Sequence, residues 1–346
     1  MSDKRKKIIY GIVFLILAVL TVIAVISQSK TFSFDKFISY IGDASPWWLI
    51  ASVISMLSVI LFEGLSVRHI CTRLGYKRSI MRSNVWSAAD IYFSAITPSA
   101  TGGQPASAVC MMRDGIPVAV CTVSLLMNLV MYTLAIIIIG VTCTFICPGV
   151  FFNFSLISKI LIVFGFAIQV GLVFVFLMLI KKDRVVLKIA DKFLSSFHKM
   201  HIVKDVEKKR ESLVETMQGY KACAKAVSGD KKLIFGALAY NMAQRLALIF
   251  VSMFVFLAVG GSASMIPQII VTQSFVVLGS NAMPVPGSVG VADYLFIDGY
   301  SSIINDAVNI ELLSRGISFY CCLILSGVII LAETLFRRTE SRRSKL

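Results

Sequence analysis

Positions 118–146 read VAVCTVSLLMNLVMYTLAIIIIGVTCTFI, a run without a charged residue. The hydrocarbon core of a bilayer is about 30 Å thick, and a helix needs about 20 apolar residues to cross it. The run exceeds that length and therefore predicts a transmembrane helix. Further runs that meet the same standard lie at 8–26, 47–67, 156–180, 233–259 and 312–336.

The composition of the whole chain supports a membrane protein. Of its 346 residues, 57% are hydrophobic and only 15% are charged, against roughly 25% charged in soluble domains. A soluble domain has too little interior to bury so much apolar surface. We therefore predict a single integral membrane domain over 1–346, an all-α polytopic helical bundle with six full spans. The run at 8–26 follows a basic stretch, as in a signal peptide, but its length and the lack of a cleavage site predict a retained span.

The positions of lysine and arginine predict the topology. The net charge is +15, and the basic residues gather in the N-terminal tail, at 68–82, in 181–232 and in the C-terminal tail. Basic loops stay on the cytoplasmic side and attract anionic lipid headgroups. We therefore expect a protein of the cell membrane with both termini in the cytoplasm, and no direct binding of nucleic acid.

Two apolar regions, 84–112 and 265–305, are interrupted by proline, glycine and polar residues. The first lies between two segments predicted to be cytoplasmic, and the second between two predicted to be outside. Each region must leave the membrane on the side where it entered, so we predict two re-entrant hairpins. The order span, span, hairpin, span then occurs twice with opposite orientation, which is the plan of an inverted repeat. Its halves would be about 1–146 and 156–336, with a cytoplasmic insert at 183–230 that forms either an amphipathic surface helix or a packed helical hairpin.

The predicted hairpin turns have similar sequences, TPSATGGQP at 97–105 and NAMPVPGSVG at 281–290. Proline interrupts helical hydrogen bonding, and glycine permits tight turns and close approach of another group. A half-helix that begins at such a turn presents free N–H groups, which bind anions such as phosphate. The alternative is that these residues only form turns.

Ionisable residues within the apolar regions are candidates for function, because charge is costly at membrane depth. Arg245 lies near the middle of a span, and we expect it to bind a phosphate or carboxylate; a structural ion pair is the alternative. Acidic side chains near the turns would hold a cationic group or pair with Arg245. The candidate headgroup-binding residues are Glu63, Asp90, Pro98, Gly102, Gly103, Gln104, Asn241, Gln244, Arg245, Asn281, Pro284, Pro286, Gly287, Gly290 and Asp293.

The sequence predicts no catalytic residue, no metal site and no cofactor. It contains no GxSxG, HExxH or Walker A pattern. His198 and His201 are three residues apart, but no cysteine or acidic residue completes a metal-binding set. Most of the cysteines lie in apolar runs, where we expect small helix-packing side chains rather than disulfides.

The hairpin turns also carry a family resemblance. The stretch 97–105, followed by DGIP at 114–117, resembles the first signature of the lysylphosphatidylglycerol synthase transmembrane (flippase-like) family. PVPGSVGVAD at 284–293 resembles its second signature, a Pro-x-Pro-Gly-Gly-x-Gly run that ends in an acidic residue. This chain departs from the family at Ser288, where glycine is usual, at Asp293, where glutamate is usual, and after Gly103, where many members have an arginine.

The resemblance covers almost the whole chain and implies a function. In that family the membrane domain is implicated in moving aminoacylated phosphatidylglycerol between leaflets. Longer members also carry a cytoplasmic domain that transfers lysine from lysyl-tRNA to phosphatidylglycerol, which gives resistance to cationic peptides. The chain ends at Leu346, so we expect no room for that domain and expect a lipid flippase-like protein. Its partners would be a membrane phospholipid and a separate aminoacyltransferase subunit, and we leave oligomerisation open. The alternatives are a phosphatidylglycerol lysyltransferase, alone or as a membrane subunit, and a small-solute transporter.

Overall fold

The computed structural model describes residues 38–39, 41–97, 101–181, 225–227, 229–281, 283, 286–288, 290–304 and 306–343. These residues are mostly helical and contain no strand, which confirms the all-α prediction for the described part of the chain. The predicted span at 8–26 and nearly all of the insert at 183–230 lie outside the described residues.

The protein is a multi-pass integral membrane protein. Within the described residues, 6 helices are long and apolar enough to cross a membrane: Pro46–Arg73, Val118–Ile146, Leu156–Val175, Lys231–Ala258, Ala263–Ser280 and Ala307–Arg337. All but Ala263–Ser280 overlap a predicted span. Ala263–Ser280 lies largely in the region 265–305, for which the sequence predicts a hairpin. The first arm of that hairpin is long and apolar enough to satisfy the criterion for a span.

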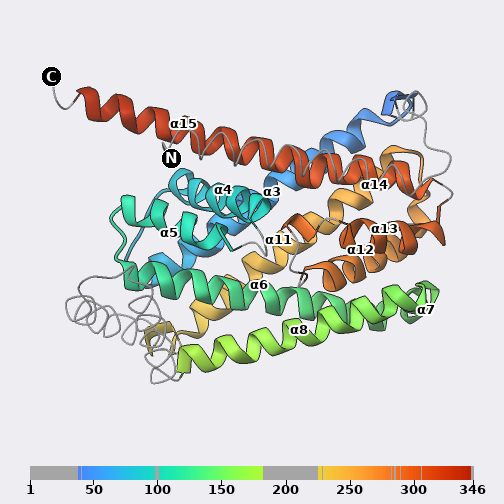
Figure 1. Cartoon of the computed structure of the whole chain (residues 1–346), viewed down its shortest axis with the longest axis horizontal. Coiled ribbons are helices and arrows are strands. Elements are labelled where there is room, and N and C mark those ends of the chain that lie inside the picture. The colour runs from blue at the N-terminus through green and yellow to red at the C-terminus, as the bar shows by residue number, and fades with distance from the viewer. Residues whose placement is uncertain are drawn as a thin grey trace, which may run out of the picture.

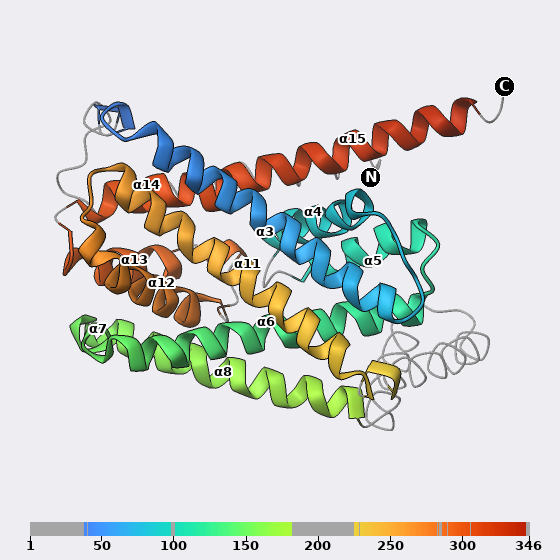
Figure 2. The same ribbon diagram turned by 180° about the vertical axis from the view of Figure 1, so that it is seen from behind.

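The long helices run roughly along the longest axis of the molecule (Figures 1 and 2). They are α3 (Pro46–Arg73), α6 (Val118–Ile146), α8 (Leu156–Lys181), α11 (Lys231–Ala258) and α15 (Cys322–Arg343). Helices α3 and α11 make the most extensive contact of any two elements, and the Ser55 hydroxyl donates to the carbonyl of Ala247 across it at 2.8 Å. Small side chains and such interhelical hydrogen bonds hold helices together in lipid, where no hydrophobic effect drives them to associate.

The first interrupted region folds as a helical hairpin of α4 (Ile80–Ile96) and α5 (Gly103–Arg113), which pack on each other. Thr97 ends α4 in an extended conformation. Its hydroxyl donates to the carbonyl of Phe93 at 2.6 Å and accepts from the N–H of Gly102 at 2.9 Å. One side chain therefore ties both ends of the turn, at the position where the sequence predicted it.

The second interrupted region also folds back on itself. Helix α12 (Ile266–Ser280) packs against α13 (Val291–Ser301), and the short 3-10 helix η3 (Pro286–Ser288) lies in the turn. Gly287 and Gly290 have positive φ angles of 60° and 81°, a conformation that glycine adopts without steric strain. The chain thus reverses direction at the predicted turn. Re-entry from one membrane face and the inverted repeat stay predictions.

The two hairpins occupy opposite halves of the molecule, and α4 contacts η3 where they meet (Figure 1). The C-terminal ends of α3 and α15 and the N-terminal end of α11 lie on the side of the first hairpin. Basic residues gather at these helix ends, as the charge pattern predicted. The orientation of this side toward the cytoplasm remains a prediction.

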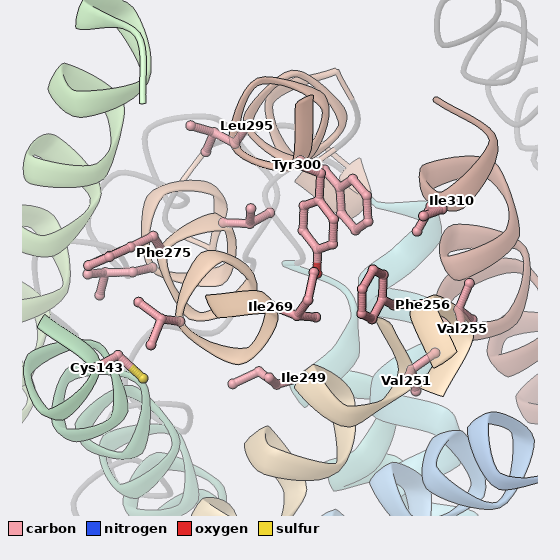
Figure 3. Packing of buried hydrophobic residues seen from close by; sticks show 14 of the residues in the cluster. Cys143, Ile249, Val251, Val255, Phe256, Ile269, Phe275, Leu295, Tyr300 and Ile310 are labelled. Carbon is pink, nitrogen blue, oxygen red and sulfur yellow. The ribbon is translucent and has the colours of Figure 1, made fainter. Parts of the chain in front are cut away.

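A buried apolar core fixes the second hairpin against α11 (Figure 3). Phe275 of α12 and Leu295 of α13 are almost completely buried in it. The rings of Phe296 and Tyr300 stack at 3.9 Å, and the hydroxyl of Tyr300 donates to Gln273 Oε1 at 3.3 Å. This packing holds the turn of the second hairpin at a fixed place inside the bundle.

Candidate functional site

Four helices bring polar side chains together inside the bundle. Glu63 comes from α3, Asp90 from α4, Tyr132 from α6, and Gln244 and Arg245 from α11. Glu63 and Arg245 are 8% and 7% exposed, so two charged groups lie almost entirely away from the surface. Buried charge on this scale is costly unless it is paired or used.

Among the described residues, Arg245 bonds to a hydroxyl and a ring rather than to a carboxylate. Its guanidinium carbon lies 4.3 Å from the centre of the Tyr132 ring, and its Nη1 donates to the Tyr132 hydroxyl at 3.1 Å. The Tyr132 hydroxyl in turn donates to Asn281 Oδ1 at 2.5 Å. Arg245 is thereby connected to the start of the turn in the second hairpin.

Arg245 also keeps a free hydrogen-bond donor. Its Nε is buried and has no hydrogen-bond partner among the described residues. The Oε1 atom of the neighbouring Gln244 is also buried and has no hydrogen-bond partner among the described residues. Buried polar groups are nearly always hydrogen-bonded, so this donor and acceptor on adjacent residues leave hydrogen-bonding capacity unused inside the bundle.

The acidic part of the site is a pair of carboxyl groups. Gln244 Nε2 donates to Glu63 Oε2 at 3.0 Å, and the Ser94 hydroxyl donates to Asp90 Oδ1 at 3.1 Å. The carboxyl groups of Glu63 and Asp90 lie close enough to influence each other electrostatically. The structure therefore joins these two predicted site residues, although they come from different helices.

The glycine pair in the first turn allows α5 to approach the acidic pair. A Cβ atom on Gly103 would lie 2.0 Å from Ser94 Oγ and 2.1 Å from Asp90 Oδ1, which is closer than any real contact. A Cβ atom on Gly102 would lie 2.6 Å from the methyl group of Thr97. Both glycines are needed for close packing, and Gly103 in particular forms the wall behind Asp90.

The two hairpins differ at the start of their second helix. Helix α5 begins at Gly103 without a side-chain cap. Helix α13 is capped, because the N–H of Gly290 donates to Asp293 Oδ2 at 2.8 Å. The positive end of the α13 dipole thus faces the Asp293 carboxylate, whereas Asp90 of α4 lies beside the start of α5, where Gln104 is half-buried in the first turn.

Asp293 pairs with an arginine that the sequence analysis did not single out. It is completely buried, and its Oδ1 lies 2.8 Å from Arg315 Nη1. Arg315 Nη2 donates to the carbonyl of Gly287 at 3.0 Å, which ties the turn to α14 (Ala307–Arg315). Buried Glu311 lies one helical turn before Arg315, and its carboxyl group is close enough to Asp293 for the two to interact electrostatically. The structure therefore pairs Asp293 with Arg315, whereas the sequence left open whether Asp293 would pair with Arg245 or hold a cationic ligand.

The side-chain amide of Asn241 is hydrogen-bonded to neighbouring helices. Its amide nitrogen donates to Ser66 Oγ at 2.8 Å, to Asn128 Oδ1 at 3.0 Å and to the carbonyl of Ala237 at 2.9 Å. These bonds join α3, α6 and α11 beside the acidic pair. All the donor capacity of the amide is used, while its Oδ1 is buried and has no partner among the described residues.

The other predicted residues are only partly accounted for. Pro98 and Pro284 lie outside the described residues, and the side chain of Pro286 is not described. Tyr132, Glu311 and Arg315 were missed. A single tyrosine inside an apolar run gives no signal, whereas the four-residue spacing of Glu311 and Arg315 at the start of a span could have indicated a helical pair. Among the described residues, no cluster of histidine, cysteine, aspartate and glutamate could hold a metal ion.

Comparison with known families gives one match. A family model described as the lysylphosphatidylglycerol synthase TM region matches residues 8–326. The match includes both hairpins and every residue of the candidate site. No curated protein matches the chain.

Proposed function

Because the chain belongs to the lysylphosphatidylglycerol synthase TM region family, we propose that it moves a phospholipid between the two leaflets of the cell membrane. The observation that carries the proposal is the group of Glu63, Asp90, Arg245 and Tyr132, which lies inside the helical bundle beside the contact between the two hairpins. The substrate would be a phospholipid with a cationic group, such as an aminoacylated phosphatidylglycerol.

The site is complementary to such a headgroup. A phosphate would accept hydrogen bonds from Arg245, whose Nε is free among the described residues, and arginine is well suited to phosphate because its donors form a planar fork. A cationic group would lie against Glu63 and Asp90. The uncapped start of α5 adds a positive dipole end on the same hairpin as Asp90.

The burial of the site favours transport over lysyl transfer. Glu63 and Arg245 lie between long apolar helices, where the acceptor end of a transfer RNA would have to penetrate the bundle. We therefore assign lysyl transfer, where it accompanies this protein, to a separate aminoacyltransferase subunit. A small-solute transporter would need a similar polar interior, and the experiment below separates that alternative from lipid movement.

The test is a leaflet-resolved lipid assay in proteoliposomes. Vesicles that contain lysylphosphatidylglycerol are treated with a membrane-impermeant amine reagent, which modifies only lipid in the outer leaflet. We expect Arg245→Ala to lose lipid movement and Arg113→Ala to keep it, because Arg113 is an exposed arginine at the end of α5. Undiminished movement by a folded Arg245→Ala variant, or uptake of a small solute without lipid movement by the wild type, would overturn the proposal.

A further inference from the structure

A groove in the surface of the bundle lies apart from the candidate site. It has a volume of about 180 Å³ and lies between α6, α8 and α12, with Phe151 of α7 also in its lining. Phe275 and Leu278 of α12 line it from the inside and are almost completely buried. Val141 of α6 and Val163 of α8 line it and are 40% and 57% exposed. The groove therefore opens outward, beside the edge of the molecule that α8 forms (Figures 1 and 2).

The lining of the groove suits a hydrocarbon chain. Among the described residues that line it, Thr144 alone has a polar side chain, and its hydroxyl donates to the carbonyl of Gly140 at 2.9 Å. The lining side chains therefore leave no polar group in need of a ligand. The walls belong to helices that are apolar enough to cross a membrane, where the surrounding medium is the hydrocarbon of the bilayer. An acyl chain restores the dispersion contacts that an empty groove would lose.

The groove is a local feature of otherwise close helix packing. A Cβ atom on Gly165 of α8 would lie 2.5 Å from the carbonyl oxygen of Leu278, so α8 and α12 touch there without room for a side chain. Gln169 of α8 donates to the same carbonyl at 2.9 Å. On α6, a Cβ atom on Gly140 would lie 2.9 Å from a methyl group of Leu278. The space therefore does not result from loose contact between these helices.

A lysine lies on the groove face of α8. Lys159 precedes Val163 by one helical turn, so the two side chains share a face. Lys159 is half-buried, and none of the ion pairs in the described part of the chain includes it. Asp298 of α13 accepts from the N–H of Ser155 at 2.9 Å instead. A cation in the first turn of a helix faces the positive end of the dipole, so an anion beside Lys159 would be stabilised by both.

Lys159 also lies at the depth of lipid phosphates. It belongs to the first turn of a membrane-spanning helix, and lysine side chains near such ends extend their ammonium group to the headgroup level. The segments 147–160 and 260–311, which connect helices at this end of the bundle, contain no other lysine or arginine. The groove and the lysine are thus arranged like the acyl chain and the phosphate of a phospholipid.

We propose that the groove and Lys159 together bind one phospholipid, with an acyl chain between α6, α8 and α12 and the phosphate at the lysine ammonium. The bound chain packs against Phe275 and Leu278 and so supports α12, the first arm of the second hairpin. This inference goes beyond the proposed lipid movement and does not depend on it, because a phospholipid that stays in the groove crosses no membrane. The predicted span at 8–26 is a weaker occupant, since it contains no acidic residue to pair with Lys159.

The experiment counts the phospholipids that stay bound to the full chain outside the membrane. The protein is reconstituted in vesicles of phosphatidylglycerol and phosphatidylethanolamine, transferred to a mild detergent and weighed by native mass spectrometry. We expect Val163→Trp, which fills the groove, to retain one phospholipid fewer than the wild type. Ile160→Trp is the matched control and should retain as many as the wild type, because Ile160 is 59% exposed on the same helix and does not line the groove.

Variants of Lys159 test the contact with phosphate. Lys159→Gln should lower the retained fraction by about tenfold, as expected for the loss of a hydrogen bond from a charged group. Lys159→Arg should keep the phospholipid, because arginine also binds phosphate. Diacylglycerol has the same acyl chains without a phosphate, so the wild type should retain it no better than Lys159→Gln does.

The outcomes separate the possible occupants. Equal phospholipid retention by Val163→Trp and Ile160→Trp, which is the result if the span at 8–26 covers the groove, overturns the proposal. A Val163→Trp variant that loses a second copy of the chain instead of a lipid also overturns it. Equal retention by Lys159→Gln and wild type overturns the contact with phosphate. Thermal unfolding in detergent checks each variant, and Val141→Trp at the opposite rim replaces Val163→Trp if that variant does not fold. None of these measurements involves lipid movement, so the proposed function is tested separately by the leaflet-resolved assay.

Discussion

Replacement of Gly103 by alanine should disable the site through steric displacement alone. The added Cβ would lie 2.0 Å from Ser94 Oγ, 2.1 Å from Asp90 Oδ1 and 2.6 Å from the Asp90 carbonyl oxygen. The two side-chain atoms can rotate away, but the carbonyl belongs to the backbone of α4. Helices α4 and α5 must therefore separate by about 0.8–1.4 Å to restore an ordinary contact of 3.4–4 Å, and Asp90 must turn away from Glu63.

The expected energy follows from two opposing terms. Alanine stabilises a helix relative to glycine by about 0.5–1 kcal/mol. Overpacking of a tight interface costs typically about 1–3 kcal/mol. We expect Gly103→Ala to be destabilised by about 1–2 kcal/mol overall and to move lipid at least about tenfold more slowly.

The assays are thermal unfolding in detergent and the leaflet-resolved lipid measurement. Gly149→Ala is the matched control, because a Cβ there would meet nothing within 4 Å in the short helix α7 (Pro148–Asn153). The double variant Gly103→Ala with Ser94→Ala should recover only part of the loss, since the contact with the Asp90 carbonyl remains. If Gly103→Ala matches Gly149→Ala in both stability and lipid movement, the close approach of α5 to Asp90 has no functional importance.

Two further substitutions test the contacts around each arginine. Tyr132→Phe keeps the ring under Arg245 but removes the hydroxyl that links Arg245 to Asn281. Because loss of a hydrogen bond to a charged group costs about 1.5–3 kcal/mol, lipid movement should fall by about tenfold or more while the protein stays folded. An unchanged rate would contradict the link. Asp293→Asn leaves the charge of Arg315 buried without its ion pair. This change should destabilise the protein by about 3–5 kcal/mol and lower its unfolding temperature in detergent. A variant as stable as wild type would show that the pair does not hold the turn.

The sequence by itself determined the kind of protein and the location of its turns. Apolar length alone predicted the described membrane-spanning helices apart from Ala263–Ser280, because the thickness of a bilayer sets the length of a helix that crosses it. Proline and glycine marked the turns near Thr97 and Gly287, because their effects on the backbone are local. Ala263–Ser280 was harder to predict, because an apolar hairpin arm and a short span have the same composition.

Only the tertiary structure decided which polar groups meet. Gln244 reaches Glu63 across 181 positions of the chain, and Tyr132 reaches Asn281 across 149. Asp293 could have paired with Arg245 as far as the sequence shows, and it pairs with Arg315 instead. Hydropathy and charge fix which segments enter the membrane, but they do not encode how helices rotate and cross. The site therefore depends on side-chain packing between helices far apart in the chain, which a single sequence does not display.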